Sequence, residues 1–157
     1  MVPVTPDRQR SAGATVLRRA GEGLRDRSGR DPGGRERQLV LASEQLGWLA
    51  STIKNEKTTR AQRYIAAGAP LPLVEIEAGK YLLDAVQELG PVRSTGMGLS
   101  IPDWQEITAF ASAHGLAFAP WEFRVIRKLC AAYLRELRSG EDPFCIPPIK
   151  RGKEQED

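Results

Sequence analysis

Residues that could carry out acid–base, nucleophilic or metal chemistry are few in this chain of 157 residues. Glu75 and Glu77 are a candidate acid–base pair, but side chains two positions apart on the helix predicted there point in different directions. His114 is the only histidine, and no second histidine or partner acid lies at the spacing of metal ligands. The sequence also lacks a Ser-His-Asp or Cys-His set. We therefore predict a protein that is not an enzyme, with no catalytic residue, metal site or cofactor-binding site.

The glycine-containing stretch PVRSTGMGLSIP, residues 91–102, is expected to be a flexible loop. It lacks both the glycine spacing and the Lys-Ser/Thr ending of a phosphate-binding loop. Arg93, near the two glycines of this stretch, is a candidate for contact with a partner. The competing interpretation is an ordinary surface turn.

Cysteine content and hydropathy indicate a compartment. The two cysteines, Cys130 and Cys145, are too few for a disulfide framework, and their apolar surroundings predict buried thiols in a reducing environment. No apolar run approaches the roughly 20 residues of a membrane span, and the chain does not start with the pattern of a secretion signal. The prediction is a cytoplasmic protein without a membrane partner.

Positive charge is concentrated at the start of the chain. Residues 1–37 contain nine arginines and five acidic residues, whereas residues 38–157 contain 14 basic and 15 acidic residues. Because residues 1–37 are also rich in glycine and proline and poor in large apolar side chains, we predict a disordered arm. Such an arm would be a solvated tail, or would bind nucleic acid only weakly through phosphate contacts.

Residues 38–149 are predicted to form a small all-α domain of about four helices. The first helix has an apolar stripe at steps of three and four residues: Leu39, Ala42, Leu46, Leu49 and Ile53. The helix is expected either to break near Asn55 or to continue to Ala67. It cannot continue beyond Ala67, because Gly68 and the prolines after it end a helix. The second helix, residues 74–89, is expected to carry Glu75 and Glu77 in its first turn.

The core unit of this domain is predicted to be residues 73–149. Its third helix should begin with Ser100 as N-cap and end at Gly115, and its fourth should run from Pro120 to Gly140. The proline-rich stretch EDPFCIPPI, residues 141–149, is expected to be extended and to pack Phe144 back on the helices. Residues 150–157 are expected to be a polar tail.

One functional interpretation of the third and fourth helices is a helix-turn-helix that binds DNA. The basic side chains of the fourth helix would then face phosphate. Against this, the connection HGLAFAP is longer than the usual three or four residues. The first turn of the would-be recognition helix also carries Trp121, Glu122 and Phe123 rather than donors for base edges.

A second interpretation comes from the order of short motifs over the second half of the chain. They are YLLDAVQELGPVR (81–93), a glycine-containing loop (96–98), IPDWQEITAFASAHG (101–115), APWEFRVIRKLCAAYL (119–134) and a DPF…PP close (142–148). In this order they resemble the tail assembly chaperones of siphophages and their frameshift-type downstream partners, encoded next to the tape measure protein. The most specific pieces are Trp-x-Glu-Ile at 104–107 and Pro-Trp-Glu at 120–122. Residues 1–70 lie outside the resemblance.

The resemblance implies a non-enzymatic function in the cytoplasm of an infected host cell. Members of this family are thought to coat the long, aggregation-prone tape measure protein, to bring tail tube protein to it, and to leave before the virion is mature; self-association is also compatible with this role. Such a chaperone needs exposed apolar surface that accepts helical segments without sequence stringency. The candidate partner-binding residues, besides Arg93, are Tyr81, Trp104, Phe118, Trp121, Phe123 and Phe144. The competing interpretation is that most of these aromatic side chains form the core.

Overall fold

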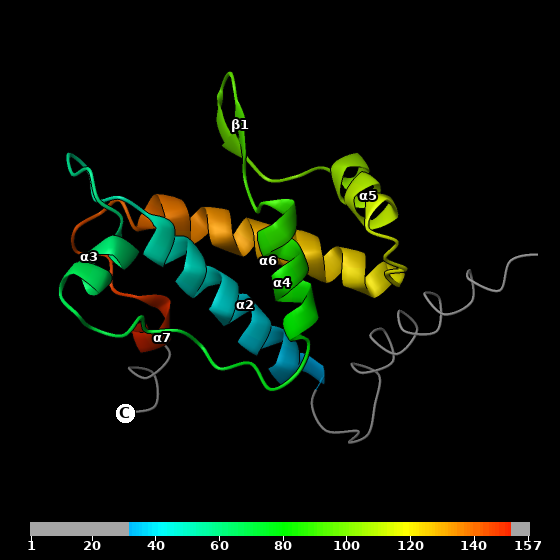
Figure 1. Cartoon of the computed structure of the whole chain (residues 1–157), viewed down its shortest axis with the longest axis horizontal. Coiled ribbons are helices and arrows are strands. Elements are labelled where there is room, and N and C mark those ends of the chain that lie inside the picture. Colours follow the sequence, from blue (N-terminus) through cyan, green and yellow to red (C-terminus); the bar gives the residue numbers. More distant parts are fainter. Residues whose placement is uncertain (1–31, 152–157) are drawn as a thin grey trace, which may run out of the picture.

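The computed structural model describes residues 32–151, and within this range it contains six helices and one two-stranded hairpin (Figure 1). The helices are α2 (Pro32–Ala50), α3 (Arg60–Ala66), α4 (Lys80–Leu89), α5 (Trp104–Ala113), α6 (Pro120–Ser139) and α7 (Pro148–Arg151). The predicted helical fold is confirmed in outline. The description all-α is only approximate, because β1 (Arg93–Thr95) and β2 (Gly98–Ser100) form a small antiparallel sheet.

The first and last predicted segments each need a correction. Helix α2 begins at Pro32, so residues 32–37 are helical although we predicted them to be part of a disordered arm. Proline is well tolerated at the first position of a helix, where its missing N–H would have no partner. Residues 150 and 151, predicted to start a polar tail, belong to α7. The rest of the arm, residues 1–31, and of the tail, residues 152–157, lies outside the described residues.

The two longest helices, α2 and α6, run side by side in the same direction (Figure 1). Glu36 of α2 pairs with Lys128 of α6, and about two turns further along both helices Glu44 pairs with Arg135. Parallel neighbours cannot be joined by a short turn. Residues 51–119 therefore form the long connection that carries the other elements back to the start of α6.

Helix α4 packs on α6 and α2, and closes the core between them (Figure 1). Leu82 and Val86 of α4 are completely buried, as are Leu129 of α6 and Ile107 of α5, and all four belong to one apolar cluster. Leu39 of α2 lies in the same cluster. The core unit predicted at residues 73–149 is therefore not separate from α2.

Helix α4 begins six residues later than predicted. Gly79 precedes it with a φ of 81°, a left-handed conformation that breaks the helical path, so residues 74–79 are not helical. Glu75 and Glu77 are consequently not in the first turn of a helix. The predicted break near Asn55 is confirmed, since α2 ends at Ala50 and Asn55 has a φ of 70°.

The stretch predicted as a flexible loop contains the β1–β2 hairpin. Arg93 is paired with Ser100 and Thr95 with Gly98, which leaves a two-residue tip of Gly96 and Met97. The hairpin projects away from the helices (Figure 1), and Met97 is fully exposed. Its base is fixed to α6, because the Arg138 guanidinium donates a hydrogen bond of 2.6 Å to the Leu99 carbonyl oxygen.

Helices α3 and α7 pack on α2, and each sends one arginine to the C-terminal end of α6. Arg60 of α3 is buried, lies 4.4 Å from the centre of the Trp48 ring, and donates to the carbonyl oxygens of Gly140 and Asp142 at 3.0 and 2.8 Å. A cation at this end of a helix stabilises its unpaired carbonyl groups.

No helix within residues 32–151 is long and apolar enough to cross a membrane.

A candidate helix-binding groove

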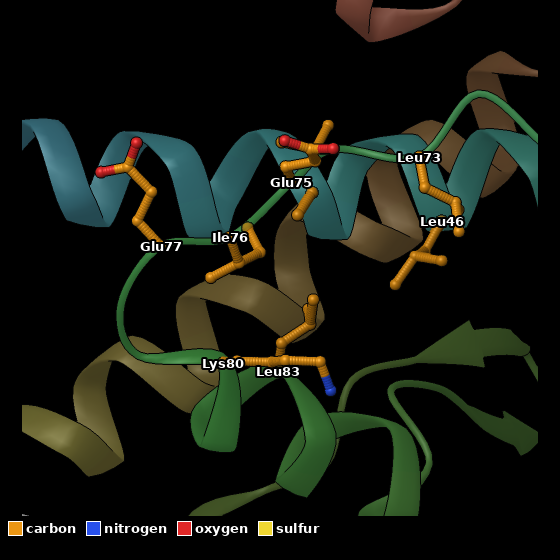
Figure 2. Close-up of a pocket in the computed structure, with 9 residues that line it drawn as sticks. Leu46, Leu73, Glu75, Ile76, Glu77, Lys80 and Leu83 are labelled. Carbon is orange, nitrogen blue, oxygen red and sulfur yellow. The ribbon is translucent and has the colours of Figure 1, made fainter.

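An apolar groove of about 580 Å³ lies between α2, the extended residues 73–77 and α4 (Figure 2). We call it the α2–α4 groove. Aliphatic side chains from all three segments line it: Ala42, Leu46, Leu73, Val74, Ile76 and Leu83. Ala42 and Leu83 are buried, whereas Leu73 is 56% exposed. The groove therefore has a closed apolar floor and an accessible apolar edge.

Residues 73–77 are held in place by backbone geometry and one polar contact. Pro70 and Pro72 prevent a helix immediately before this segment. The Gln38 side-chain amide of α2 then donates a hydrogen bond of 2.7 Å to the Glu75 carbonyl oxygen. This contact fixes the segment beside α2 and so keeps the groove open on the side away from the core.

The edge of the groove is acidic. Glu75 and Glu77 are exposed, and neither carboxylate has an ion pair or hydrogen bond with another residue of the range 32–151. Lys80, the cation at the groove, is paired with Asp84 one turn along α4, with Nζ to carboxylate oxygen distances of 2.8 and 2.9 Å. A ligand with an apolar face and flanking cations would complement this surface.

None of the seven candidate partner-binding residues lines this groove. Four of them, Tyr81, Phe118, Trp121 and Phe123, are partly buried and pack against the core. The Phe118 and Phe123 rings meet edge to face with their centroids 5.6 Å apart. These four positions support the interpretation that aromatic side chains here form the core.

Tyr81 also has a polar role. Its hydroxyl donates a hydrogen bond to the buried Glu122 carboxyl, which accepts a second bond of 2.6 Å from the Ala119 N–H at the start of α6. Burial, followed by the contact with Glu122, raises the pKa of the Tyr81 hydroxyl. Glu122 therefore links α4 to the first turn of α6.

The Arg93 side chain is bound to other residues of the same chain. Its guanidinium forms an ion pair of 2.8 Å with Glu106 and donates to the carbonyl oxygens of Leu89 and Gly90 at 3.1 and 3.0 Å. The pKa of Glu106 is lowered mainly by the hydrogen bond from the Asp103 N–H and, to a smaller extent, by the hydrogen bond from Arg93. Asp103 and Glu106 form a capping box, so Asp103 and not Ser100 is the N-cap of α5.

Trp104 and Phe144 are the two candidates with widely exposed side chains. Trp104 is 44% exposed and lies under the Arg127 guanidinium, whose central carbon is 4.8 Å from the centre of the indole ring. Phe144 was expected to pack back on the helices, but it is 90% exposed. Phe144 lies in a turn in which the Cys145 N–H donates a hydrogen bond to the Asp142 carbonyl oxygen, and its side chain points outward from this turn.

The remaining candidates for chemistry also occupy structural positions. His114 Nδ1 lies 3.1 Å from the Phe110 carbonyl oxygen at the end of α5, and Nε2 lies 3.3 Å from Glu88. Burial raises the pKa of the Cys130 thiol to about 11, whereas Cys145 is only partly buried and lies 3.1 Å from the Arg151 guanidinium. Within residues 32–151, no three His, Cys, Asp or Glu side chains gather as metal ligands would.

Sequence reasoning missed the groove although one signal was present. Val74, Glu75, Ile76 and Glu77 alternate between apolar and acidic, which is typical of an extended segment with one buried face. We instead assigned these residues to a helix.

A comparison with protein-family models, curated proteins and solved structures finds no significant match. The resemblance to tail assembly chaperones therefore rests on the sequence motifs alone.

Proposed function

We propose that the protein is a tail assembly chaperone of a siphophage, acts without catalysis in the host cytoplasm, and binds helical segments of the tape measure protein in the α2–α4 groove. In this proposal the groove covers the apolar face of a client helix until tail tube protein replaces the chaperone. The observation that carries the proposal is the apolar groove itself, with its accessible edge at Leu73.

The shape and lining of the groove suit a helical client. A helix presents its apolar side chains at spacings of three and four residues, and aliphatic grooves between helices accept such side chains without strict sequence requirements. The acidic edge at Glu75 and Glu77 would favour clients in which lysine or arginine flanks the apolar face. The sequence resemblance at residues 81–148 supplies the particular client, the tape measure protein.

Co-expression with the tape measure protein of the same phage tests the proposal. The soluble fraction of the client should rise, and the two proteins should co-purify in moderate salt because apolar contacts are not screened. Leu73→Glu should reduce binding by about tenfold or more, since burial of such a side chain contributes about 1.5–3 kcal/mol. The exposed position of Leu73 makes this variant compatible with folding.

Ile65→Glu is the matched control. Ile65 is an aliphatic residue that is 65% exposed on α3 and does not line the groove. This variant should bind the client as the parent does. If the client is equally insoluble with and without the protein, the chaperone proposal is wrong. Equal loss of binding in Leu73→Glu and Ile65→Glu would instead exclude the groove as the binding site.

The alternative of DNA binding by α5 and α6 has little support from the surface of α6. Lys128 and Arg135 are paired with glutamates of α2, and Arg138 is bonded to the hairpin. Eight residues of α6 are buried, among them Leu129 and Glu136, because this helix is the central element of the fold. A recognition helix instead leaves a basic face free for the major groove.

A further inference from the structure

We propose that the arginine-rich segment before α2, residues 1–31, binds in the α2–α4 groove of its own chain. A segment of the same molecule would then occupy the groove until a client displaces it. The competition with a client rests on the proposed function, but the binding of the segment does not. The proposal gives a role to the N-terminal arginines, to which the proposed chaperone function assigns none.

The start of α2 lies close to one end of the groove. Gln38, six residues after Pro32, contacts the Glu75 backbone, which is about 9 Å along the helix axis at 1.5 Å per residue. Leu46, at the other end of the groove, lies about 21 Å along the same axis. A connection of seven residues, 25–31, spans up to about 23 Å, so the residues before it can reach the whole groove.

The charges of the segment and the groove are complementary. Residues 1–31 contain seven arginines and four acidic residues. The groove presents Glu75 and Glu77, neither of which has a partner among the described residues, while its one lysine is already paired. Arg19 stands in the middle of the segment, where it would meet these glutamates.

The same part of the segment has the apolar side chains that the groove requires. Val16, Ala20 and Leu24 recur at steps of four residues, and Leu17 lies beside them. On a helix these residues would share one face, Arg19 would flank that face, and Arg18 would lie on the opposite side. A helix over residues 14–24 would be about 16 Å long, enough to cover the roughly 12 Å of groove between the levels of Gln38 and Leu46 on α2.

Hydrogen exchange of the full-length protein tests this proposal. Backbone amides of residues 73–79 and 14–24 should be protected in the parent chain. Both regions should exchange at least about tenfold faster in the double variant Leu17→Asp/Leu24→Asp. The control Val2→Asp/Val4→Asp adds the same charges outside the proposed contact and should change neither region. Unchanged exchange of α6 would show that each variant is folded.

Charge exchange gives a second, independent test. Glu75→Arg/Glu77→Arg should release the segment, and combination with Arg19→Glu should restore protection. The proposal is overturned if residues 73–79 exchange equally in the parent and in Leu17→Asp/Leu24→Asp. It is also overturned if protection rises with protein concentration, because the segment of a second copy would then occupy the groove.

A client-binding measurement separates this proposal from the chaperone function. If both hold, Leu17→Asp/Leu24→Asp should bind a tape measure segment several-fold more tightly than the parent, because the competing segment is removed. If the parent shows protection but no variant binds the client, the segment binds the groove and the proposed function fails. If the client binds equally to the parent and the variant, the N-terminal segment does not compete with the client for the groove.

Discussion

Gly47 of α2 lies directly against the backbone of Tyr133 in α6. A Cβ atom on Gly47 would be 2.9 Å from the Tyr133 carbonyl carbon and closer still to its oxygen. One turn before this point, Ser43 Oγ donates a hydrogen bond of 2.8 Å to the Leu129 carbonyl oxygen. Small residues on α2 thus bring the backbones of the two parallel helices together, and this contact sets the position of α2 as one wall of the groove.

Replacement of Gly47 should therefore be strongly destabilising. Gly47→Ala forces the two helices apart, and overpacking of this kind typically costs about 1–3 kcal/mol. Gly96→Ala is the matched control, because a Cβ atom at Gly96 meets nothing within 4 Å. Urea denaturation should give a clearly lower midpoint for Gly47→Ala alone. Equal midpoints for both variants would mean that α2 and α6 are not in backbone contact at Gly47.

The Tyr81–Glu122 contact predicts a sensitivity to alkaline pH. The pKa of Tyr81 is raised above its ordinary value of 10.0, so above that pH the unfolded chain loses a proton that the folded chain retains. Stability should consequently fall as pH rises above about 10, since the unfolded state then binds fewer protons. Burial also raises the pKa values of Tyr133 and Cys130, so the pH dependence of the parent's stability does not by itself identify the contribution of Tyr81.

Tyr81→Phe isolates the contribution of this hydroxyl. At neutral pH the variant should lose about 1–3 kcal/mol, because the buried Glu122 carboxyl loses one of its donors. Its stability should then fall less steeply between pH 10 and pH 11 than that of the parent. Thermal melts at several pH values measure both effects. Parallel pH profiles would show that the Tyr81 hydroxyl titrates normally in the folded protein.

Arg151 is a structural residue at a position where a polar tail was expected. Its guanidinium forms two hydrogen bonds of 2.8 Å with Glu136, which is 3% exposed. Arg151→Ala should cost about 2–3 kcal/mol, somewhat less than the loss of a partner in a fully buried pair, because the arginine is partly in water. Lys150→Ala, at an exposed neighbour, should be neutral. Denaturant titrations of the two variants test this difference.

Local sequence signals were sufficient for several elements of the fold. Pro120 and Gly140 delimit α6 as predicted. Proline at the first helical position acts through its own backbone geometry, whereas Gly140 has a helical φ of −68° and leaves room for the Ser51 side chain. The apolar stripe beginning at Leu39 likewise identified α2, whose buried residues recur at helical spacing. The start of α6 and the apolar stripe of α2 depend on residues within a few positions of one another.

The missed features depend on contacts between distant residues. The strands of the hairpin are three residues long, too short for a pattern, and Arg138 fixes them from 39 positions away. The groove requires Gln38 to hold Glu75, which no periodicity in either segment encodes. Six of the seven partner-binding candidates are aromatic residues, and which aromatic side chain is exposed is decided by packing. Leu73, exposed beside Pro72, was passed over for the same reason.

The two tryptophans at the start of α5 and α6 provide the last prediction. Trp121 packs against the core, while Trp104 is 44% exposed beneath Arg127. Trp121→Ala should therefore cost about 2–4 kcal/mol through loss of buried area and the space left behind. Trp104→Ala should cost about 1 kcal/mol or less, the contribution of an exposed cation–π contact. Unfolding curves of the two variants in urea measure the difference. If Trp104→Ala is the more damaging substitution, α5 is held to α6 mainly through the Trp104–Arg127 contact, and the assignment of Trp121 to the core is wrong.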